Sequence, residues 1–374
     1  MINPFHYGGI VGEDAFCNRK QELADLGRAA ENGDRTLVYA ERRMGKTSLI
    51  RRVLDGLPKK SFLSIYVDLW ATRDAASFAR TVARATTEAA ASRADKMLET
   101  GKELFRHLIP SLTLDEAGNP SVQFGARSGI EDEPQIEEAL DAPARLAEKR
   151  GRRVVMVYDE IQRIGEYGND TVERMLRSRI QPHAEVAYFF LGSRRHLIQR
   201  MFMEQRRPLY HAAGHYPLAP IATEHWIPFI EERFSTADKP IPETVINALC
   251  ERTGGHPYYT QYLAHDLWEI APTGDSVSGA MLQSAEDLLL SRLAYPYTVL
   301  WEGLTANQQR VLRGLATEPP PARPFASTFL HRHGLAGSSA HRAVEGLLER
   351  DLIDREGKGY ILSDRFLRLW LRRW

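Results

Sequence analysis

One ten-residue run has the residue types and the spacing needed to hold a nucleotide phosphate. It is Tyr39-Ala40-Glu41-Arg42-Arg43-Met44-Gly45-Lys46-Thr47-Ser48, between a short apolar stretch at 36–39 and an amphipathic stretch that begins at Lys46. A strand, a turn and a helix in this order place backbone N–H groups and a helix N-terminus around a β-phosphate. Lys46 would then contact the β- and γ-phosphates, and the Thr47 hydroxyl would bind Mg²⁺.

The run departs from the strict pattern G-x-x-x-x-G-K-[ST] at its first position, which Ala40 occupies. Alanine still permits the turn if its φ is negative. The alternative is a Gly-Lys-Thr tripeptide in an ordinary turn, but the strand before it and the helix after it favour a phosphate loop. We therefore expect Ala40 to affect the affinity of the site rather than its identity.

Two adjacent carboxylates end a second apolar run. The run is Val154-Val155-Met156-Val157-Tyr158, and Asp159 and Glu160 follow it, as in a buried parallel strand that ends at a ligand-binding edge. Asp159 is predicted to hold Mg²⁺, directly or through water, and Glu160 to orient and polarise an attacking water. Two solvated acids at a strand end are the alternative, and the upstream phosphate loop favours the paired roles.

A third apolar run, from Ala187 to Leu191, stops at Gly192-Ser193-Arg194-Arg195. If this strand lies beside the other two, its first polar side chain lies between their motifs. Ser193 is then a candidate sensor of the γ-phosphate or of the lytic water, and Arg194 or Arg195 a candidate counter-charge. A basic helix N-terminus explains the two arginines equally well.

Strands and helices alternate from about position 35 to 195, which predicts an α/β domain with a parallel sheet and crossover helices. A further strand at 60–68 precedes a long alanine-rich helical stretch from Asp74 towards Ile109. A hairpin at 111–124 comes before a helix at about 134–149. The hairpin is either a partner contact or, more simply, a long connection.

The pattern becomes helical throughout from roughly 222 to 290, with breaks at 236–242 and 254–257, as expected for a helical lid. From Leu304 onwards, helices and a hairpin that turns at Gly357-Lys358-Gly359 indicate a winged helix, followed by an amphipathic helix at 365–374 with Asp364 as its cap. The sequence thus predicts a P-loop NTPase core at 1–215, a helical lid at 216–295 and a winged-helix domain at 296–374.

The predicted winged helix is mildly basic, because residues 301–374 hold twelve Lys and Arg against eight Asp and Glu. If it binds double-stranded DNA, the candidate contacts are His341 and Arg342 for the major groove and Arg355 and Lys358 for the backbone. Glu345 and Glu349 on the same predicted helix oppose phosphate, and winged helices also dock proteins. DNA and protein therefore both stay open as partners.

Together these motifs resemble the archaeal-type ATPases of the STAND group, relatives of AAA+ proteins that join a P-loop domain to a helical lid and a winged helix. The matching segments are Asn3-Pro4-Phe5, Phe16-Cys17-Asn18-Arg19-Lys20-Gln21-Glu22-Leu23, residues 42–48, Asp159-Glu160-Ile161-Gln162-Arg163-Ile164, Gly192-Ser193 and Gly254-Gly255-His256-Pro257-Tyr258-Tyr259. They span most of the chain, and as a set they are fairly specific.

The resemblance assigns further residues to the site. It implies that Phe16 and Arg19 border the adenine, that Gly255 and Pro257 contact the base or ribose side, and that Arg194 contacts the γ-phosphate. His256, beside a proline at a helix start, is more typical of a structural cap than of a phosphate contact. If a homo-oligomer supplies an arginine in trans, the candidates are Arg177 and Arg179.

Two functions follow from these assignments. In the first, the chain is a switch that binds and hydrolyses ATP with Mg²⁺, and its nucleotide state controls a partner through the lid and the winged helix. In the second, it is a nucleotide-gated DNA-binding protein that resembles initiator or transposition-helper ATPases, with slow or incidental hydrolysis. The intact Glu160 favours the first, and the basic balance of residues 301–374 supports the second.

The composition is that of a large intracellular protein. The chain has 374 residues, 43% hydrophobic and 26% charged, enough for two or three domains. Cys17 and Cys250 lie far apart and give no disulfide framework, which favours a reducing compartment, the cytoplasm. No basic leader with an apolar core and no membrane-length apolar window is present. A net charge of zero argues against a uniformly basic nucleic-acid coat but leaves room for a local patch.

Overall fold

The computed structural model describes residues 2–9, 12, 15–91, 93–126 and 131–373. They form two compact units, which we call the sheet unit (Lys20–Ala40 and Leu49–Leu218) and the helical unit (Met1–Arg19, Glu41–Ser48 and Ala219–Trp374). The predicted phosphate loop, residues 41–48, belongs to the helical unit, although the chain on both sides of it belongs to the sheet unit.

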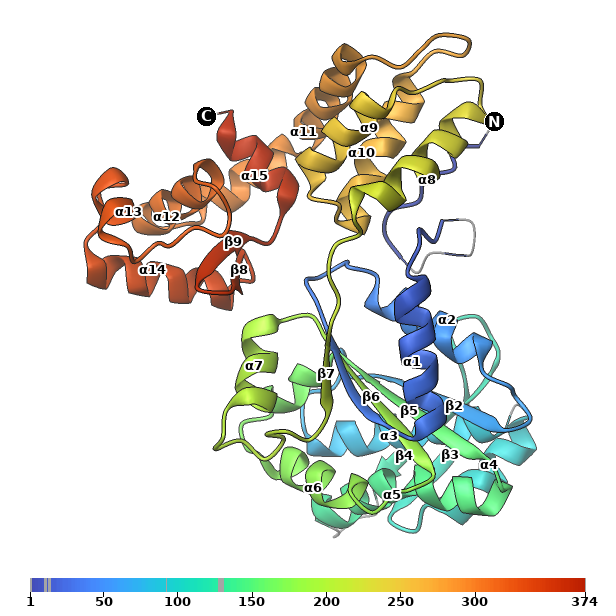
Figure 1. The fold of residues 1–374 in the computed structure, drawn as a ribbon. Helices are drawn as coiled ribbons and strands as arrows, with labels where there is room; N and C mark the ends of the chain where they lie inside the picture. The colour runs from blue at the N-terminus through green and yellow to red at the C-terminus, as the bar shows by residue number, and fades with distance from the viewer. Residues whose placement is uncertain (1, 10–11, 13–14, 92, 127–130, 374) are drawn as a thin grey trace. The chain divides into compact units, whose positions relative to one another are not determined.

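A five-stranded parallel sheet with the strand order β2-β5-β6-β1-β7 forms the centre of the sheet unit (Figure 1). The strands are β1 (Arg35–Tyr39), β2 (Phe62–Asp68), β5 (Arg153–Asp159), β6 (Val186–Gly192) and β7 (Gly214–Pro217). β6 is buried along its whole length, and β5 almost so, which explains why their sequences are continuous apolar runs rather than alternating ones. The predicted α/β class is confirmed.

The edge strand β7 is absent from the sequence-based prediction. It pairs in parallel with β1, from Thr36 opposite Gly214 to Tyr39 opposite Pro217. Its sequence, Gly-His-Tyr-Pro, lacks an apolar run and ends in a proline, which sheets accommodate at edges. Pairing with a strand already in place, rather than local propensity, defines this element.

The helices of the sheet unit are α1 (Lys20–Asn32), α3 (Ala75–Ala90), α4 (Ala94–Leu104), α5 (Asp132–Arg150), the short η1 (Ile161–Glu166), α6 (Thr171–Ile180) and α7 (Arg195–Met203), and α2 (Lys46–Gly56) begins in the phosphate loop. The helical stretch predicted from Asp74 towards Ile109 consists of two helices, α3 and α4, and ends at Leu104. The chain is extended at Ala91, with φ −149°, and α4 ends at Leu104 because Leu104 and Phe105 turn into the core of this unit. Ser92, inside the predicted helix, lies outside the described residues.

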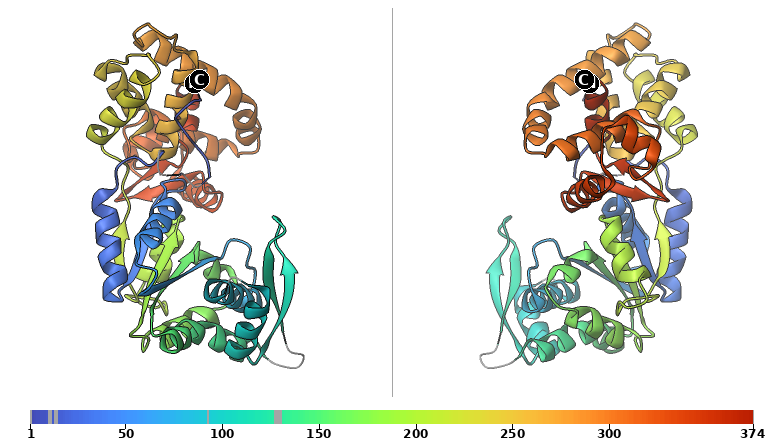
Figure 2. Two further views of the ribbon diagram at one scale, coloured as in Figure 1. Left: turned by 90° about the vertical axis from the view of Figure 1, so that its right-hand side faces the viewer. Right: turned by 90° about the vertical axis from the view of Figure 1, so that its left-hand side faces the viewer.

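The predicted hairpin is confirmed. β3 (Leu108–Leu114) pairs antiparallel with β4 (Pro120–Ala126). The Asp115 carboxylate accepts hydrogen bonds from the backbone N–H groups of Ala117 and Asn119, at 2.9 and 2.8 Å, and Gly118 supplies the positive φ of the turn. Figure 2 shows the hairpin standing out from the rest of the sheet unit.

The helical unit contains the predicted lid and winged helix. The lid helices are α8 (Thr223–Ser235), α9 (Glu243–Thr253), α10 (Pro257–Ile270) and α11 (Gly279–Glu302), and the winged helix consists of α12 (Ala306–Thr317), α13 (Ser327–Arg332), α14 (Gly337–Glu349), β8 (Ile353–Glu356) and β9 (Gly359–Leu362). Both predicted breaks between the lid helices are present. The described chain contains no helix long and apolar enough to span a membrane.

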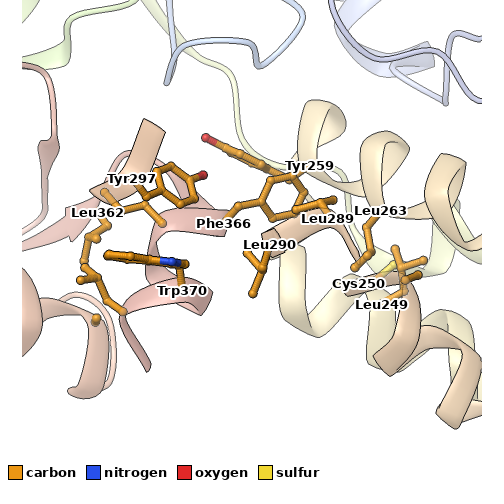
Figure 3. Packing of buried hydrophobic residues seen from close by; sticks show 14 of the residues in the cluster. Leu249, Cys250, Tyr259, Leu263, Leu289, Leu290, Tyr297, Leu362, Phe366 and Trp370 are labelled. Carbon is orange, nitrogen blue, oxygen red and sulfur yellow. The ribbon is translucent and has the colours of Figure 1, made fainter. Parts of the chain in front are cut away.

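The last helix, α15 (Arg365–Arg372), packs both on the winged helix and on the lid helices. Phe366 packs against the ring of Tyr259, with centroids at 4.9 Å, and Trp370 packs on Tyr297 at 5.8 Å (Figure 3). The Tyr262 ring also lies 5.5 Å from Phe366. The predicted Asp364 cap is confirmed, because its carboxylate accepts from the backbone N–H groups of Phe366 and Leu367. The start of α15 is therefore firmly placed within the helical unit. Trp374, the end of the predicted helix, lies outside the described residues.

Candidate functional site

The predicted phosphate loop has the local backbone that its sequence requires. β1 ends at Tyr39 and α2 begins at Lys46. Positive φ angles fall on Arg43 (60°) and Gly45 (86°) but not on Ala40. A chain that alternates in this way turns successive N–H groups toward one side, which forms a concave site for an anion. Alanine in place of the first glycine therefore costs no backbone strain.

The Lys46 side chain forms a hydrogen bond with the backbone of the loop. The Lys46 ammonium donates to the Glu41 carbonyl at 3.0 Å and is buried. Met44 and Ser48 are buried as well, whereas Thr47 is half-buried and Arg42 and Arg43 are exposed. Because the Met44 side chain is buried in the protein, only the backbone of Met44 is available for the expected contact with a nucleotide.

Three strand ends meet at one edge of the sheet. Tyr39 lies opposite Gly192, and Tyr158 lies opposite Phe190, so β6 separates β1 from β5. The Ala40 N–H also donates to the Gly192 carbonyl at 3.3 Å. The expected position of the β6 strand between the other two is confirmed. Asp159 and Ser193 therefore emerge at the edge from which the chain enters the phosphate loop.

The Asp159 carboxylate is held by two donors at this edge. One oxygen accepts from the Tyr66 hydroxyl and the other from the Glu160 N–H at 2.8 Å. Glu160 itself adopts the left-handed conformation, with φ 55° and ψ 43°. Such a conformation is costly for a residue with a side chain and is found where a side chain must be aimed.

Glu160 points toward Ser193. The Ser193 hydroxyl donates to the two Glu160 carboxylate oxygens at 2.8 and 3.1 Å, and the Gln162 amide also donates to Glu160. The sequence analysis includes Gln162 only in the matching segment 159–164 and assigns it no role. Its position two residues after Glu160, in the first turn of η1, explains how it reaches that carboxylate.

Three of the candidate arginines have partners within the sheet unit. Arg194 forms an ion pair with Glu166 at 2.6 Å. Arg179 pairs with Glu137 and Asp141, and Arg177 donates to the Tyr210 carbonyl at 3.2 Å. Any role for these guanidinium groups toward a phosphate, in the same chain or in trans, therefore requires them to exchange a protein partner for it.

The residues expected near the base lie in the helical unit. Phe16 is half-buried, and Arg19 is buried with φ 69° and donates to the Ala219 carbonyl at 2.7 Å. Pro257 is the first residue of α10. Gly255 has φ 65°, and a Cβ there would lie 2.2 Å from the Ile221 carbonyl oxygen. Glycine is required at this position by the backbone itself, whatever the nucleotide contacts.

His256 is the N-cap residue of α10, in line with the structural cap that the sequence suggested, but its ring makes no capping hydrogen bond. Its Nε2 instead donates to the Arg42 carbonyl of the phosphate loop at 3.1 Å. Burial, assisted by the positive charge of Arg365, lowers the pKa of His256 to about 3. The ring is therefore neutral at physiological pH. Its hydrogen bond to Arg42 links the start of α10 to the phosphate loop.

Acidification is expected to destabilise the fold through His256. Its pKa of about 3 in the folded chain lies below the ordinary value of 6.5, so the unfolded chain binds more protons between these two values. This contribution is complete above about pH 6.5 and is lost as the pH falls toward 3, by at most about 1.4 kcal/mol per pH unit. Thermal unfolding of the protein and of His256→Gln between about pH 7 and 5 measures it, and equal pH slopes would contradict it.

Two further groups of the helical unit contact the loop. Arg365, the first residue of α15, pairs with the Glu41 carboxylate, its Nη2 lying 3.0 and 2.9 Å from the two oxygens. Asp351, just after α14, pairs with Arg42 at 3.0 Å. The Arg43 guanidinium also lies 4.3 Å from the centre of the Tyr258 ring. These partners follow the loop by more than two hundred residues, so sequence patterns gave no sign of them.

Two family models match the chain. Residues 16–263 match an ATPase domain found predominantly in Archaea, and residues 295–373 match a probable winged helix domain. The first match covers most of the chain, so the chain belongs to this archaeal-type ATPase family. It is a P-loop ATPase that carries a C-terminal winged helix. The α/β fold and the archaeal-type ATPase family inferred from the motifs are thereby confirmed.

Solved structures agree on the fold. A Walker-type ATPase of Pyrococcus abyssi is 18% identical with a TM-score of 0.65, covering 96% of this chain and 97% of that one. The ORC2 protein of Aeropyrum pernix in ADPNP-ADP complexes is 12% identical with a TM-score of 0.53, covering 95% and 93%. These low identities show a shared fold alone. No curated protein matches the chain.

Proposed function

We propose that the chain is an ATP-hydrolysing switch of the STAND type, whose nucleotide state controls a partner through the lid and the winged helix. One observation supports this most: His256 of the lid and Asp351 and Arg365 of the winged-helix region bond to the phosphate loop. A nucleotide bound in that loop changes its charge and its backbone. It therefore changes the free energy of those contacts, which is the requirement for coupling a ligand to a domain.

In this proposal Mg²⁺ is held by Thr47 and Asp159 together with phosphate oxygens. Among the residues that the structure describes, no group of three or more His, Cys, Asp or Glu is arranged to hold a metal ion. A nucleotide-linked Mg²⁺ needs no such group, since one or two protein oxygens, phosphates and water complete its shell. The ion, when bound, neutralises charge that develops on the phosphates. The fixed Asp159 carboxylate suits this role.

Glu160 activates the attacking water in this scheme. Its carboxylate is oriented by Ser193 and Gln162, which supports Ser193 as the residue that senses the γ-phosphate or the water. Lys46 binds the β- and γ-phosphates, and Arg194 would leave Glu166 to contact the γ-phosphate. Phe16, Arg19 and Pro257 border the base and the ribose.

A DNA-binding function is the second candidate, supported by the winged helix and its mildly basic balance. The contacts expected from α14 are less favourable. The His341 ring stacks on Phe325, with ring centres at 4.0 Å, and Glu345 and Glu349 are exposed on the same helix. These carboxylates repel phosphate, so we favour a protein partner, including a second copy of the chain. The two free, buried cysteines are consistent with the reducing cytoplasm.

MgATP turnover, measured with and without double-stranded DNA at two salt concentrations, tests the proposal, with Glu160→Gln as the background control. We expect turnover that DNA does not change. Stimulation that fades with added salt would instead support the DNA-binding candidate, because phosphate contacts release counterions. Absence of any turnover above the Glu160→Gln background would contradict the hydrolytic switch.

A further inference from the structure

The phosphate loop carries a buried negative charge of its own. Glu41 lies two residues after Tyr39, the last residue of β1, and its side chain is 5% exposed. A buried carboxylate is costly unless it is paired. In a loop that receives a nucleotide it has a second cost, since it repels the phosphate charge at short range in a medium of low dielectric constant. Binding therefore depends on what neutralises Glu41.

Arg365 provides that neutralisation with a preorganised guanidinium. Its side chain is 15% exposed, its Nη2 is shared between both Glu41 oxygens, and its Nη1 donates to the Leu362 carbonyl at 3.0 Å. The residue opens α15, which the Asp364 cap and the packing of Phe366 hold in place. Little side-chain freedom remains to be lost when the pair forms.

The neighbouring ion pair of the loop is a weaker contact. Arg42 and Asp351 are 46% and 18% exposed. Water and salt screen a pair of this kind, which contributes little to stability. Of these two ion pairs, the Glu41–Arg365 pair is the buried one, so its loss removes more of the charge compensation beside the phosphates.

We propose that Arg365 is a positioning residue for nucleotide binding: by neutralising Glu41 it makes the phosphate loop receptive to a nucleotide, so that affinity depends on the docking of α15 on the loop. This inference rests on the proposed function of the loop. Because coupling between two equilibria is reciprocal, bound nucleotide in turn strengthens the docking of α15. The Glu41–Arg365 ion pair thereby couples the nucleotide state of the loop to α15, which packs on the winged helix.

Titration calorimetry with MgADP tests this without hydrolysis. We expect Arg365→Gln to weaken MgADP about tenfold or more, within the usual range of coupling between sites. Glu41→Gln alone should bind at least as tightly as the unmodified protein, and the double variant Glu41→Gln/Arg365→Gln should recover affinity to within about threefold. Arg373→Gln is the matched control, because Arg373 is the C-cap residue of the same helix and pairs with Glu286 and Asp287. It should bind normally.

Each other outcome has a defined meaning. Normal MgADP binding by folded Arg365→Gln overturns the inference, and so does a loss of affinity that Glu41→Gln fails to restore, since that would indicate a purely structural role. If Arg365→Gln does not fold, weakened binding by Glu41→Gln alone overturns it. Lys46→Ala separates this inference from the proposed function: if it binds MgADP as well as the unmodified protein, the loop itself is misassigned.

Discussion

Glu160→Gln is expected to lower the turnover number for MgATP by about 100-fold or more and to leave nucleotide affinity within a few-fold, in line with the usual contribution of a general base. The amide keeps the size of the side chain and an oxygen that can accept from Ser193, which donates to Glu160 at 2.8 Å. It loses the negative charge that polarises water. Steady-state phosphate release, together with titration of a non-hydrolysable ATP analogue, separates the two effects.

Glu185→Gln is a suitable control for this substitution. Glu185 precedes β6 at the opposite edge of the same sheet and pairs with Arg153 at 3.5 Å, where both side chains are largely exposed. The same change of carboxylate to amide should leave turnover unchanged there. Normal turnover by purified Glu160→Gln would show that Glu160 is not the general base.

Lys46→Ala should weaken nucleotide binding by about 10- to 100-fold, the range expected when a hydrogen bond to a charged group is lost. In the structure the Lys46 ammonium is bonded to the Glu41 carbonyl, so it is already placed over the loop. Alanine deletes the cation that would offset the β- and γ-phosphates. Turnover at sub-saturating MgATP should fall at least in proportion, because the lost charge also stabilises the transition state.

Calorimetry with MgADP measures this effect, and a thermal unfolding scan shows whether the variant folds. Lys59→Ala removes an exposed lysine between α2 and β2 and should bind as the unmodified chain does. Unchanged affinity in folded Lys46→Ala would mean that residues 41–48 do not hold the phosphates.

The sequence predicts the elements that local chemistry specifies. β1, β5 and β6 appear as apolar runs because strands buried in a parallel sheet exclude polar residues. The phosphate loop is recognisable because its function lies in the backbone of a few successive residues, where Gly45 alone marks the turn. The Asp159-Glu160 pair was identified for the same reason, since a polar residue directly after such a strand lies at the edge of the sheet.

Other features depended on partners that are distant in the chain. β7 exists because β1 offers it an edge, and α4 ends where it does because Leu104 and Phe105 pack into the core. Helix and strand propensities are weak beside such packing. Alanine-rich sequence therefore indicated that a helix forms but not where it ends.

The coupling contacts were the least predictable part of the site. Glu41 and Arg365 are separated by 324 positions, and each reads in the sequence as an ordinary charged residue. The contact of His256 was equally unpredictable, because its partner is the backbone carbonyl of Arg42 and no pattern of side chains indicates such a bond. By itself, then, the sequence determined the order of the elements and the chemistry of the loop, because both depend on neighbouring residues. Only the tertiary structure decided which charges the loop buries and pairs, because burial arises when distant segments pack together.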